Sequence, residues 1–150
     1  MGLIGFSQGT KVVAGLLRGA QIRREVGARG EQWLESFHFA LSVCGSYSPP
    51  LLPTSVLKLP EFASKGDDEK ARLLSVKITA PVLHVQGEQD EWKWAGDELI
   101  SGNYEEGEGR SVVERWDMGH HYPQRLEESD RMKDWLVEQL RMLDESQKAA

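Results

Sequence analysis

The sequence predicts an α/β fold with about four mainly parallel strands and flanking helices. Short apolar segments rich in β-branched and aromatic side chains recur along the 150 residues, and segments with apolar side chains at helical spacing lie between them. This alternation is typical of parallel sheets joined by right-handed crossovers. A composition of 39% hydrophobic and 28% charged residues is that of an ordinary globular protein, so we expect residues 1–150 to form a single domain.

The N-terminal third contains a strand, a helix and a second strand. Residues 3–6 are apolar and are expected to be the end of a buried strand. Residues 8–26 place apolar side chains at near-helical spacing until Gly27 interrupts the pattern, which predicts a helix. The segment 37–44 is rich in aromatic and apolar residues and stops at Gly45, which predicts the next strand.

The segment 46–60 combines prolines with leucines. Because proline interrupts regular structure, we expect a loop or a short helix there. The leucines need cover, and two interpretations are equally open. The segment lies over a pocket, so that Leu51 and Leu52 contact a substrate, or it is a surface connection packed on its own domain.

The C-terminal half contains two further strands and a long helix. Residues 81–86 form an apolar run that predicts a strand, and residues 111–116 predict a shorter, more exposed one. Residues 127–143 predict an amphipathic helix that packs on the sheet, and residues 144–150 are expected to fray. The apolar stripe of this helix consists of Met132, Trp135, Leu136, Leu140 and Leu143.

Composition and charge exclude several function classes. A net charge of −6 and a pI near 5.3 argue against a nucleic-acid partner, because phosphate binding needs clustered Lys and Arg. The one cysteine, Cys44, excludes an internal disulfide and fits a reducing compartment. No apolar run has the length that a bilayer requires, and no secretion signal is recognisable. We therefore expect a cytoplasmic protein without a membrane partner.

Ser7 lies in the motif Gly5-Phe6-Ser7-Gln8-Gly9, between a predicted strand and a predicted helix. This is the context of a nucleophile elbow, in which a sharp turn exposes the serine hydroxyl. Small neighbours two residues before and after the serine allow the strand and the helix to approach closely. The motif therefore predicts Ser7 as a nucleophile, with the backbone N–H of Gln8 as one donor to an oxyanion.

The elbow stands unusually early in the chain. In α/β-hydrolases several strands precede the nucleophile, and the second oxyanion donor comes from an upstream loop. Only six residues precede Ser7. We therefore expect a partial α/β-hydrolase fold, the C-terminal part of a larger hydrolase, in which the N-terminal strands are missing. The strand that carries Ser7 would then form an edge of the sheet.

A serine nucleophile needs a histidine as base and an acid that orients the histidine. In this class of fold they follow in the order serine, acid, histidine, each after a strand. Asp90 follows the strand at 81–86, and His120 follows the strand at 111–116, so both fit. Asp90 is favoured over four other acids. Glu88 and Glu91 are expected nearer the loop surface, Asp97 inside the following helix, and Asp117 on the same loop as the histidine.

His120 and His121 are neighbours, so only one of them can act as the base. His120 is favoured because it follows Gly119, which would let the loop turn inward. The pair has no further ligand at a useful spacing, so we expect no metal site. Cys44 is expected to be a small buried hydrophobe.

Trp92 and Trp94 follow Asp90 closely. Their rings could line an acyl pocket, in which case Trp92 is a candidate substrate contact. They could instead pack against the adjoining helix, which is the interpretation that we favour.

Three stretches resemble the fungal serine hydrolase family, which includes esterases and the thioesterases of polyketide gene clusters. They are GLIGFSQG at residues 2–9, HVQGEQDEW at residues 84–92 and GHHYP at residues 119–123. The resemblance covers nearly the whole chain and implies an α/β-hydrolase whose triad is Ser7, Asp90 and His120. A departure is Met118, where the family usually has glycine.

The resemblance implies hydrolysis of a small-molecule acyl ester or of a thioester held on a carrier, without a cofactor. The cluster members are most similar around Asp90, Glu91 and Trp92, and they release an acyl product from a synthase carrier domain. A polyketide synthase carrier domain is thus an expected partner. Two alternatives remain open: a non-catalytic remnant that keeps the triad residues, or a half that depends on another chain for the missing strands.

Overall fold

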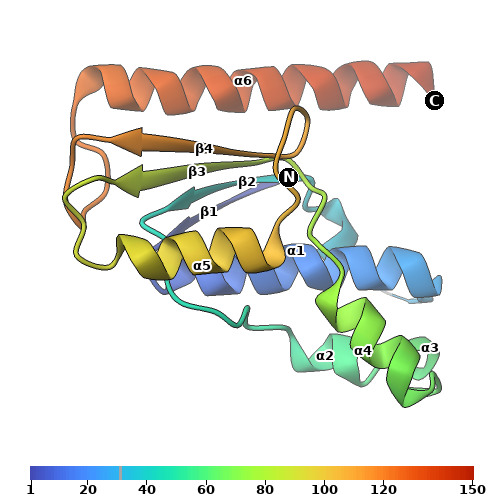
Figure 1. The fold of residues 1–150 in the computed structure, drawn as a ribbon. Helices are drawn as coiled ribbons and strands as arrows, with labels where there is room; N and C mark the ends of the chain where they lie inside the picture. The colour runs from blue at the N-terminus through green and yellow to red at the C-terminus, as the bar shows by residue number, and fades with distance from the viewer. Residues whose placement is uncertain (31) are drawn as a thin grey trace.

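A parallel sheet forms the centre of the structure, a computed structural model that describes residues 1–30 and 32–150. Its strands are β1 (Gly2–Phe6), β2 (Phe39–Val43), β3 (Val82–Gly87) and β4 (Ser111–Trp116). All neighbouring pairs are parallel and the order is β1-β2-β3-β4, so the four carboxyl ends lie at one edge (Figure 1). The predicted α/β class with four parallel strands is confirmed.

Helices cover both faces of the sheet. Helix α6 (Leu126–Ala149) lies on one face, and α1 (Gly9–Val26) and α5 (Lys93–Asn103) lie on the other (Figure 1). Short helical segments pack around Ala20 and Ile22 of α1. They are the 3-10 helix η1 (Trp33–Ser36), α2 (Thr54–Leu57), α3 (Pro60–Ala63) and α4 (Asp67–Ser75). No helix in the described part of the chain is long and apolar enough to cross a membrane.

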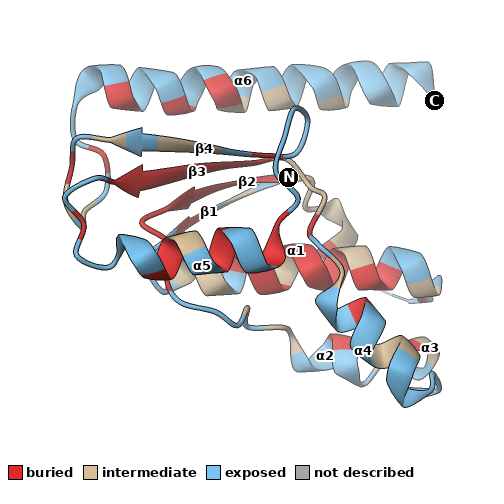
Figure 2. Ribbon diagram, viewed as in Figure 1, coloured by how far each residue is buried: buried red, intermediate tan, exposed pale blue. Residues whose placement is uncertain are grey.

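The two central strands are buried on both faces, as Figure 2 shows. Leu41 and Leu83 face α6, where the ring of Phe39 meets the Trp135 ring edge-on at a centroid distance of 6.1 Å. Ala40 and Val82 face α1 and α5 in a second apolar cluster. A continuous apolar run is what a strand covered on both sides requires. Apolar clusters on both faces, together with the pairing of β2 with β3, hold the ends of these two strands next to each other.

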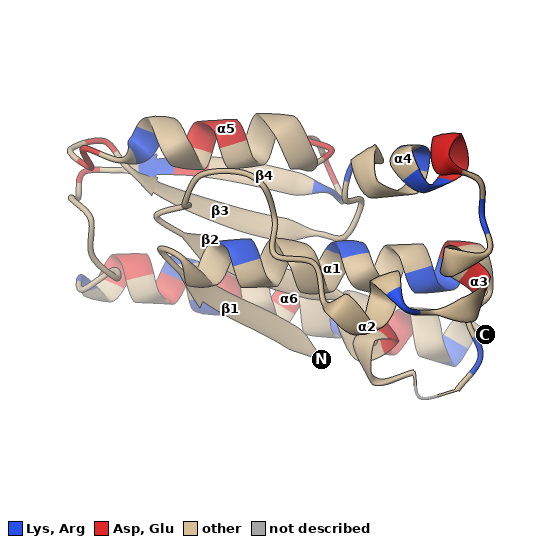
Figure 3. Ribbon diagram, turned by 90° about the horizontal axis from the view of Figure 1, so that it is seen from below, with Lys and Arg blue, Asp and Glu red and all other residues tan. Residues whose placement is uncertain are grey.

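The two outer strands differ from each other in exposure and in charge. β1 is an edge strand, as expected, but it is not buried: Ile4 is 58% and Phe6 is 37% exposed. The expectation of a buried strand was wrong because the core under α6 contains no residue of β1. β4 instead carries Glu114 and Arg115, whose side chains pair with helices α6 and α5. Figure 3 shows charge on β4 and none on β1.

Helix α6 is longer than the sequence predicts. It continues to Ala149, whereas the apolar pattern predicts a helix only over residues 127–143. Ion pairs one turn apart lie along the extension, namely Arg141 with Glu145, and Lys148 with Asp144 at 2.6 Å. The apolar stripe is also narrower than expected, since Leu140 is 55% exposed.

Candidate active site

Ser7 stands in a sharp turn between β1 and α1. Its φ of 51° lies in the left-handed region, which costs a non-glycine residue about 1–3 kcal/mol. The Ser7 N–H donates to the Val43 carbonyl at 3.0 Å, which ties the turn to the next strand. A Cβ at Gly5 would lie 2.7 Å from Val13 Cγ2, so this glycine allows the helix to approach. A Cβ at Gly9 would meet nothing within 4 Å, so close packing does not require the second glycine.

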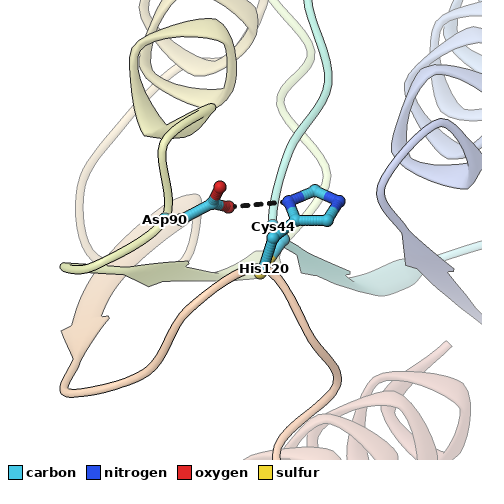
Figure 4. A group of neighbouring side chains, drawn as sticks. All are labelled: Cys44, Asp90 and His120. Atoms are coloured by element: carbon cyan, nitrogen blue, oxygen red, sulfur yellow. Dashed lines mark hydrogen bonds and ion pairs between the residues drawn. The ribbon is translucent and has the colours of Figure 1, made fainter.

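Ser7, His120 and Asp90 lie in one hydrogen-bonded row. His120 Nε2 is 2.9 Å from Ser7 Oγ, and His120 Nδ1 is 2.9 Å from Asp90 Oδ2. Figure 4 shows the contact between the Asp90 carboxylate and the imidazole. Asp90 is 3% exposed, and its other oxygen accepts the Trp92 N–H at 2.8 Å. The three residues follow β1, β3 and β4, whose carboxyl ends share one edge of the sheet.

The row of contacts selects one tautomer of His120. A carboxylate only accepts hydrogen bonds, so Nδ1 carries the proton that Asp90 receives. Nε2 is then the free base, and it accepts from the Ser7 hydroxyl. This arrangement can draw a proton from the serine and stabilise the resulting imidazolium.

The loops that carry Asp90 and His120 are in close contact through Gly87. A Cβ at this position would lie 2.4 Å from the Met118 carbonyl oxygen. Gly119, by contrast, has no left-handed φ, and a Cβ there would have its nearest contact at 3.9 Å. The inward turn of the histidine loop therefore depends on Gly87 of the neighbouring strand rather than on Gly119.

The competing residues lie apart from this row. His121 Nδ1 contacts the Tyr122 carbonyl at 2.9 Å instead of Ser7. Asp97 pairs with Arg115 at 2.8 Å on the surface. The remaining acids that sequence reasoning considered, Glu88, Glu91 and Asp117, are exposed.

Cys44 lies beside Asp90 and His120, as Figure 4 shows. One ligand atom from each of the three residues falls within 4.8 Å of the others, which their sequence spacing does not reveal. Burial, followed by the nearby Asp90 carboxylate, raises the pKa of the Cys44 thiol to about 11. The thiol contacts the carbonyls of Gly119 and His121 at 3.7 and 3.6 Å. At neutral pH it is protonated, so it serves neither as a nucleophile nor as a ready metal ligand.

A pocket of about 230 Å³ opens in front of the row. Trp92 lines it and is half exposed, and its ring centroid is 6.3 Å from that of Trp94. Trp92 therefore lines the pocket, against the favoured interpretation, whereas Trp94 does not line it and is half exposed. The Gln8 backbone N–H donates to no group within the described residues and is free to face a ligand. The lining residues are Ser7, Gln8, Gly45, Ser46, Tyr47, Trp92, Ala95 and His120.

Leu51 and Leu52 do not line this pocket. Leu51 is 54% exposed, and Leu52 packs in the cluster around Ala20 of α1. The segment runs along α1 away from Ser7, and the Leu51 carbonyl oxygen would lie only 1.7 Å from a Cβ at Gly15. Sequence reasoning instead missed Ser46 and Tyr47, although both follow the end of β2 at the edge where ligands bind in parallel sheets.

Comparison with known proteins identifies the family. The family model described as Serine hydrolase (FSH1) matches residues 1–132. Among solved structures, the acyl-protein thioesterase 2 of Zea mays is similar with a TM-score of 0.46 and 19% identity, over 91% of this chain and 54% of that one. The chain thus spans about half the length of that protein. The search of curated proteins found no match. Because the matching model covers most of its length, the chain belongs to the FSH1 family of serine hydrolases.

Proposed function

We propose that this serine hydrolase is an esterase or thioesterase in which Ser7 attacks an acyl carbonyl. The observation that carries the proposal is the row from Ser7 Oγ to His120 to Asp90, with two contacts of 2.9 Å at the mouth of a pocket. Serine, base and acid at these distances are what nucleophilic catalysis of acyl transfer requires.

The reaction follows from the geometry in two steps. Ser7 Oγ bonds to the carbonyl carbon while its proton moves to His120 Nε2, and the oxyanion faces the Gln8 N–H. The tetrahedral intermediate then expels an alcohol or thiol, which takes the proton from His120. A water molecule, deprotonated by the same nitrogen, attacks the acyl-enzyme and frees the acid and Ser7. Asp90 stabilises the imidazolium in both steps.

The pocket supports an apolar acyl group as the substrate. Its volume of about 230 Å³ is below the roughly 300–1,000 Å³ of pockets that enclose drug-sized ligands. Trp92 and Tyr47, each about half exposed, continue the apolar surface outward. A short acyl chain would fill the pocket, while a longer one would rest on these rings.

The resemblance to polyketide-cluster thioesterases supports a thioester on a synthase carrier domain as the substrate of the whole protein. The corresponding test compares an acyl thioester on a carrier domain with the same acyl group on a p-nitrophenyl ester. A value of kcat/KM that is not higher for the carrier-bound substrate argues for a free ester.

A fluorophosphonate probe tests the nucleophile. We expect the probe to label the wild-type chain and to leave Ser7→Ala unlabelled. Ser129→Ala, which changes an exposed serine on α6, is the matched control and should be labelled like the wild type. Equal labelling of Ser7→Ala and the wild type would contradict the assignment, and an unlabelled wild type would favour the non-catalytic remnant.

The free edge of β1 favours a second proposal, that further strands complete the enzyme. Ile4 and Phe6 are exposed on this strand, and an uncharged parallel edge invites another strand to pair. The second oxyanion donor that we expect from an upstream loop would come with these strands, and loss of one such donor costs on the order of 10²–10³ in rate. If this proposal holds, a version extended upstream, or a complementing chain, should raise kcat by about that factor.

A further inference from the structure

The segment after β2 is held along the first turns of α1. The Ser46 N–H donates to Thr10 Oγ1 at 2.9 Å, and the Leu51 N–H donates to the Lys11 carbonyl at 3.0 Å. Between them, Lys11 Nζ lies 4.2 Å from the centre of the Tyr47 ring. Ser46 and Tyr47 line the pocket, so these contacts fix one of its walls.

Thr10 joins this wall to the nucleophile. Its hydroxyl donates to the Ser7 carbonyl at 2.5 Å and accepts the Ser46 N–H at 2.9 Å. The Thr10 backbone N–H donates to the same Ser7 carbonyl at 3.0 Å. The residue is fully buried, so water does not compete for these bonds. One side chain thus contacts both the strained backbone of Ser7 and the pocket wall.

Gln86 anchors the same wall from the other side. Its Oε1 accepts the Gly45 N–H at 2.9 Å, and its Nε2 approaches the Lys93 carbonyl at 3.4 Å at the start of α5. A Cβ at Gly96 would lie 2.0 Å from this nitrogen, so the amide fills a slot that glycine leaves open. The consecutive N–H groups of Gly45 and Ser46 therefore both end on buried side chains instead of on a strand.

We propose that Thr10 is a positioning residue that keeps the Ser7 hydroxyl and the pocket wall of residues 45–47 in register. The proposal rests on the proposed function of Ser7. Without the hydroxyl, the buried Ser46 N–H has no acceptor and the Ser7 carbonyl loses its shortest hydrogen bond. The wall and the elbow then shift relative to each other, and a displacement of 1 Å between reacting groups costs about 10²-fold in rate.

Two variants of Thr10 isolate the hydroxyl. Thr10→Val keeps the shape and removes both bonds, so kcat per labelled active site should fall about 10- to 100-fold and KM should rise. Thr10→Ser keeps the hydroxyl and should stay within about threefold of the wild type on the same scale. Thr79→Val is the matched control. It removes a threonine hydroxyl bonded to Gln21 at 3.2 Å, before β3 and thus at the opposite edge of the sheet, and should leave both constants unchanged.

Gln86→Met serves as the second variant, including the case in which Thr10→Val fails to fold. This change removes the acceptor of the Gly45 N–H but no contact of Ser7. We therefore expect a raised KM with a smaller loss of kcat than in Thr10→Val. The midpoint of the pH–rate profile should not move in either variant, because the contacts between His120 and Asp90 remain.

Hydrogen exchange at the Ser46 amide, followed by NMR, tests the hydrogen bond between Thr10 and Ser46 without relying on activity. We expect faster exchange in Thr10→Val and wild-type exchange in Thr10→Ser. A lower Tm with unchanged kcat and KM per labelled site would overturn the proposal, as would equal losses in both Thr10 variants or unchanged exchange. An unlabelled wild type would instead count against the proposed function, while the amide exchange would still test the hydrogen bond between Thr10 and Ser46.

Discussion

The turns after β1 and β2 share a left-handed φ but have opposite environments. Ser7 has a φ of 51° and Cys44 a φ of 49°, and each N–H donates to a carbonyl of the next strand, Val43 at 3.0 Å and Val85 at 2.9 Å. Ser7 is half-buried and meets His120, whereas Cys44 is fully buried. A turn at the end of a parallel strand thus presents a side chain at the edge where ligands bind, and its surroundings decide whether it reacts.

The difference also reverses the intrinsic order of reactivity. A thiol ionises far more readily than a hydroxyl, but burial and the Asp90 carboxylate raise the pKa of Cys44 to about 11. The Ser7 hydroxyl needs no ionisation of its own because His120 Nε2 lies 2.9 Å away and can take the proton during attack.

His120 is the feature that distinguishes the first turn from the second, because it contacts Ser7. His120→Ala should lower kcat for short p-nitrophenyl esters by at least about 10³-fold, because Ser7 then lacks a proton acceptor. His121→Ala should keep most of the activity, since its ring contacts a backbone carbonyl instead of Ser7. Steady-state kinetics of both purified variants decide the matter, and the reverse pattern would assign the base to His121.

A thiol placed in the first turn gives both turns the same reactive group in different environments. In Ser7→Cys, iodoacetamide should alkylate residue 7 at least about 10-fold faster than Cys44, because His120 promotes the thiolate and the pocket gives access. Peptide mass spectrometry of samples quenched over time locates the label. Faster modification of Cys44 in the folded protein would show that burial does not control this pair.

Cys44→Ala tests whether the second turn is only structural. Activity should stay within about threefold, and the free energy of unfolding should fall by about 1 kcal/mol for the lost buried group. In the folded protein the pKa of the Cys44 thiol is raised from its ordinary value of 9.0 to about 11. The stability that this shift contributes is therefore fully present below pH 9 and is lost as the pH rises towards 11. Urea unfolding at several pH values should show that this part of the decline is absent from Cys44→Ala.

The first turn follows an edge strand, whereas the second follows a central strand. The wild-type chain should self-associate through β1, and Ile4→Lys should reduce this because a charge on an exposed edge opposes pairing. Sedimentation velocity over a concentration series measures the change. Val137→Lys, on the exposed surface of α6, adds the same charge elsewhere and should leave association unchanged. A monomeric wild type would remove the basis for this prediction.

Much of the fold could be predicted because three of the four strands have a clear apolar run and all four end at a glycine or polar residue. The positions of Ser7, Asp90 and His120 could be anticipated for the same reason, since Ser7 directly follows its strand and the other two lie on the loops after β3 and β4. The burial of β1 was predicted wrongly because a strand's own residues do not reveal where α6 packs. The extension of α6 beyond residue 143 carries ion pairs such as Lys148 with Asp144, which an apolar pattern does not register.

The pocket was harder to predict than the row of polar residues. Its wall at Ser46 depends on buried bonds to Thr10, a contact across 36 residues. The choice between the two interpretations of the segment with Leu51 was open because its path is set by Gly15 on α1, where the backbones of two elements come into close contact. Cys44 lies near Asp90 only because β2 and β3 are neighbours in the sheet. These are consequences of tertiary packing, and local sequence does not encode them in a readable way.

The row from Ser7 to His120 joins residues 113 positions apart in the chain. Contacts of such separation form late, because the entropy of closing a long loop must be overcome before they stabilise the fold. During synthesis Ser7 emerges before His120, so a nascent chain that has not yet reached His120 carries an unactivated serine. Recovery of hydrolysis after denaturation would therefore follow the completion of β3, β4 and their loops, and would lag behind the recovery of helical signal from α1.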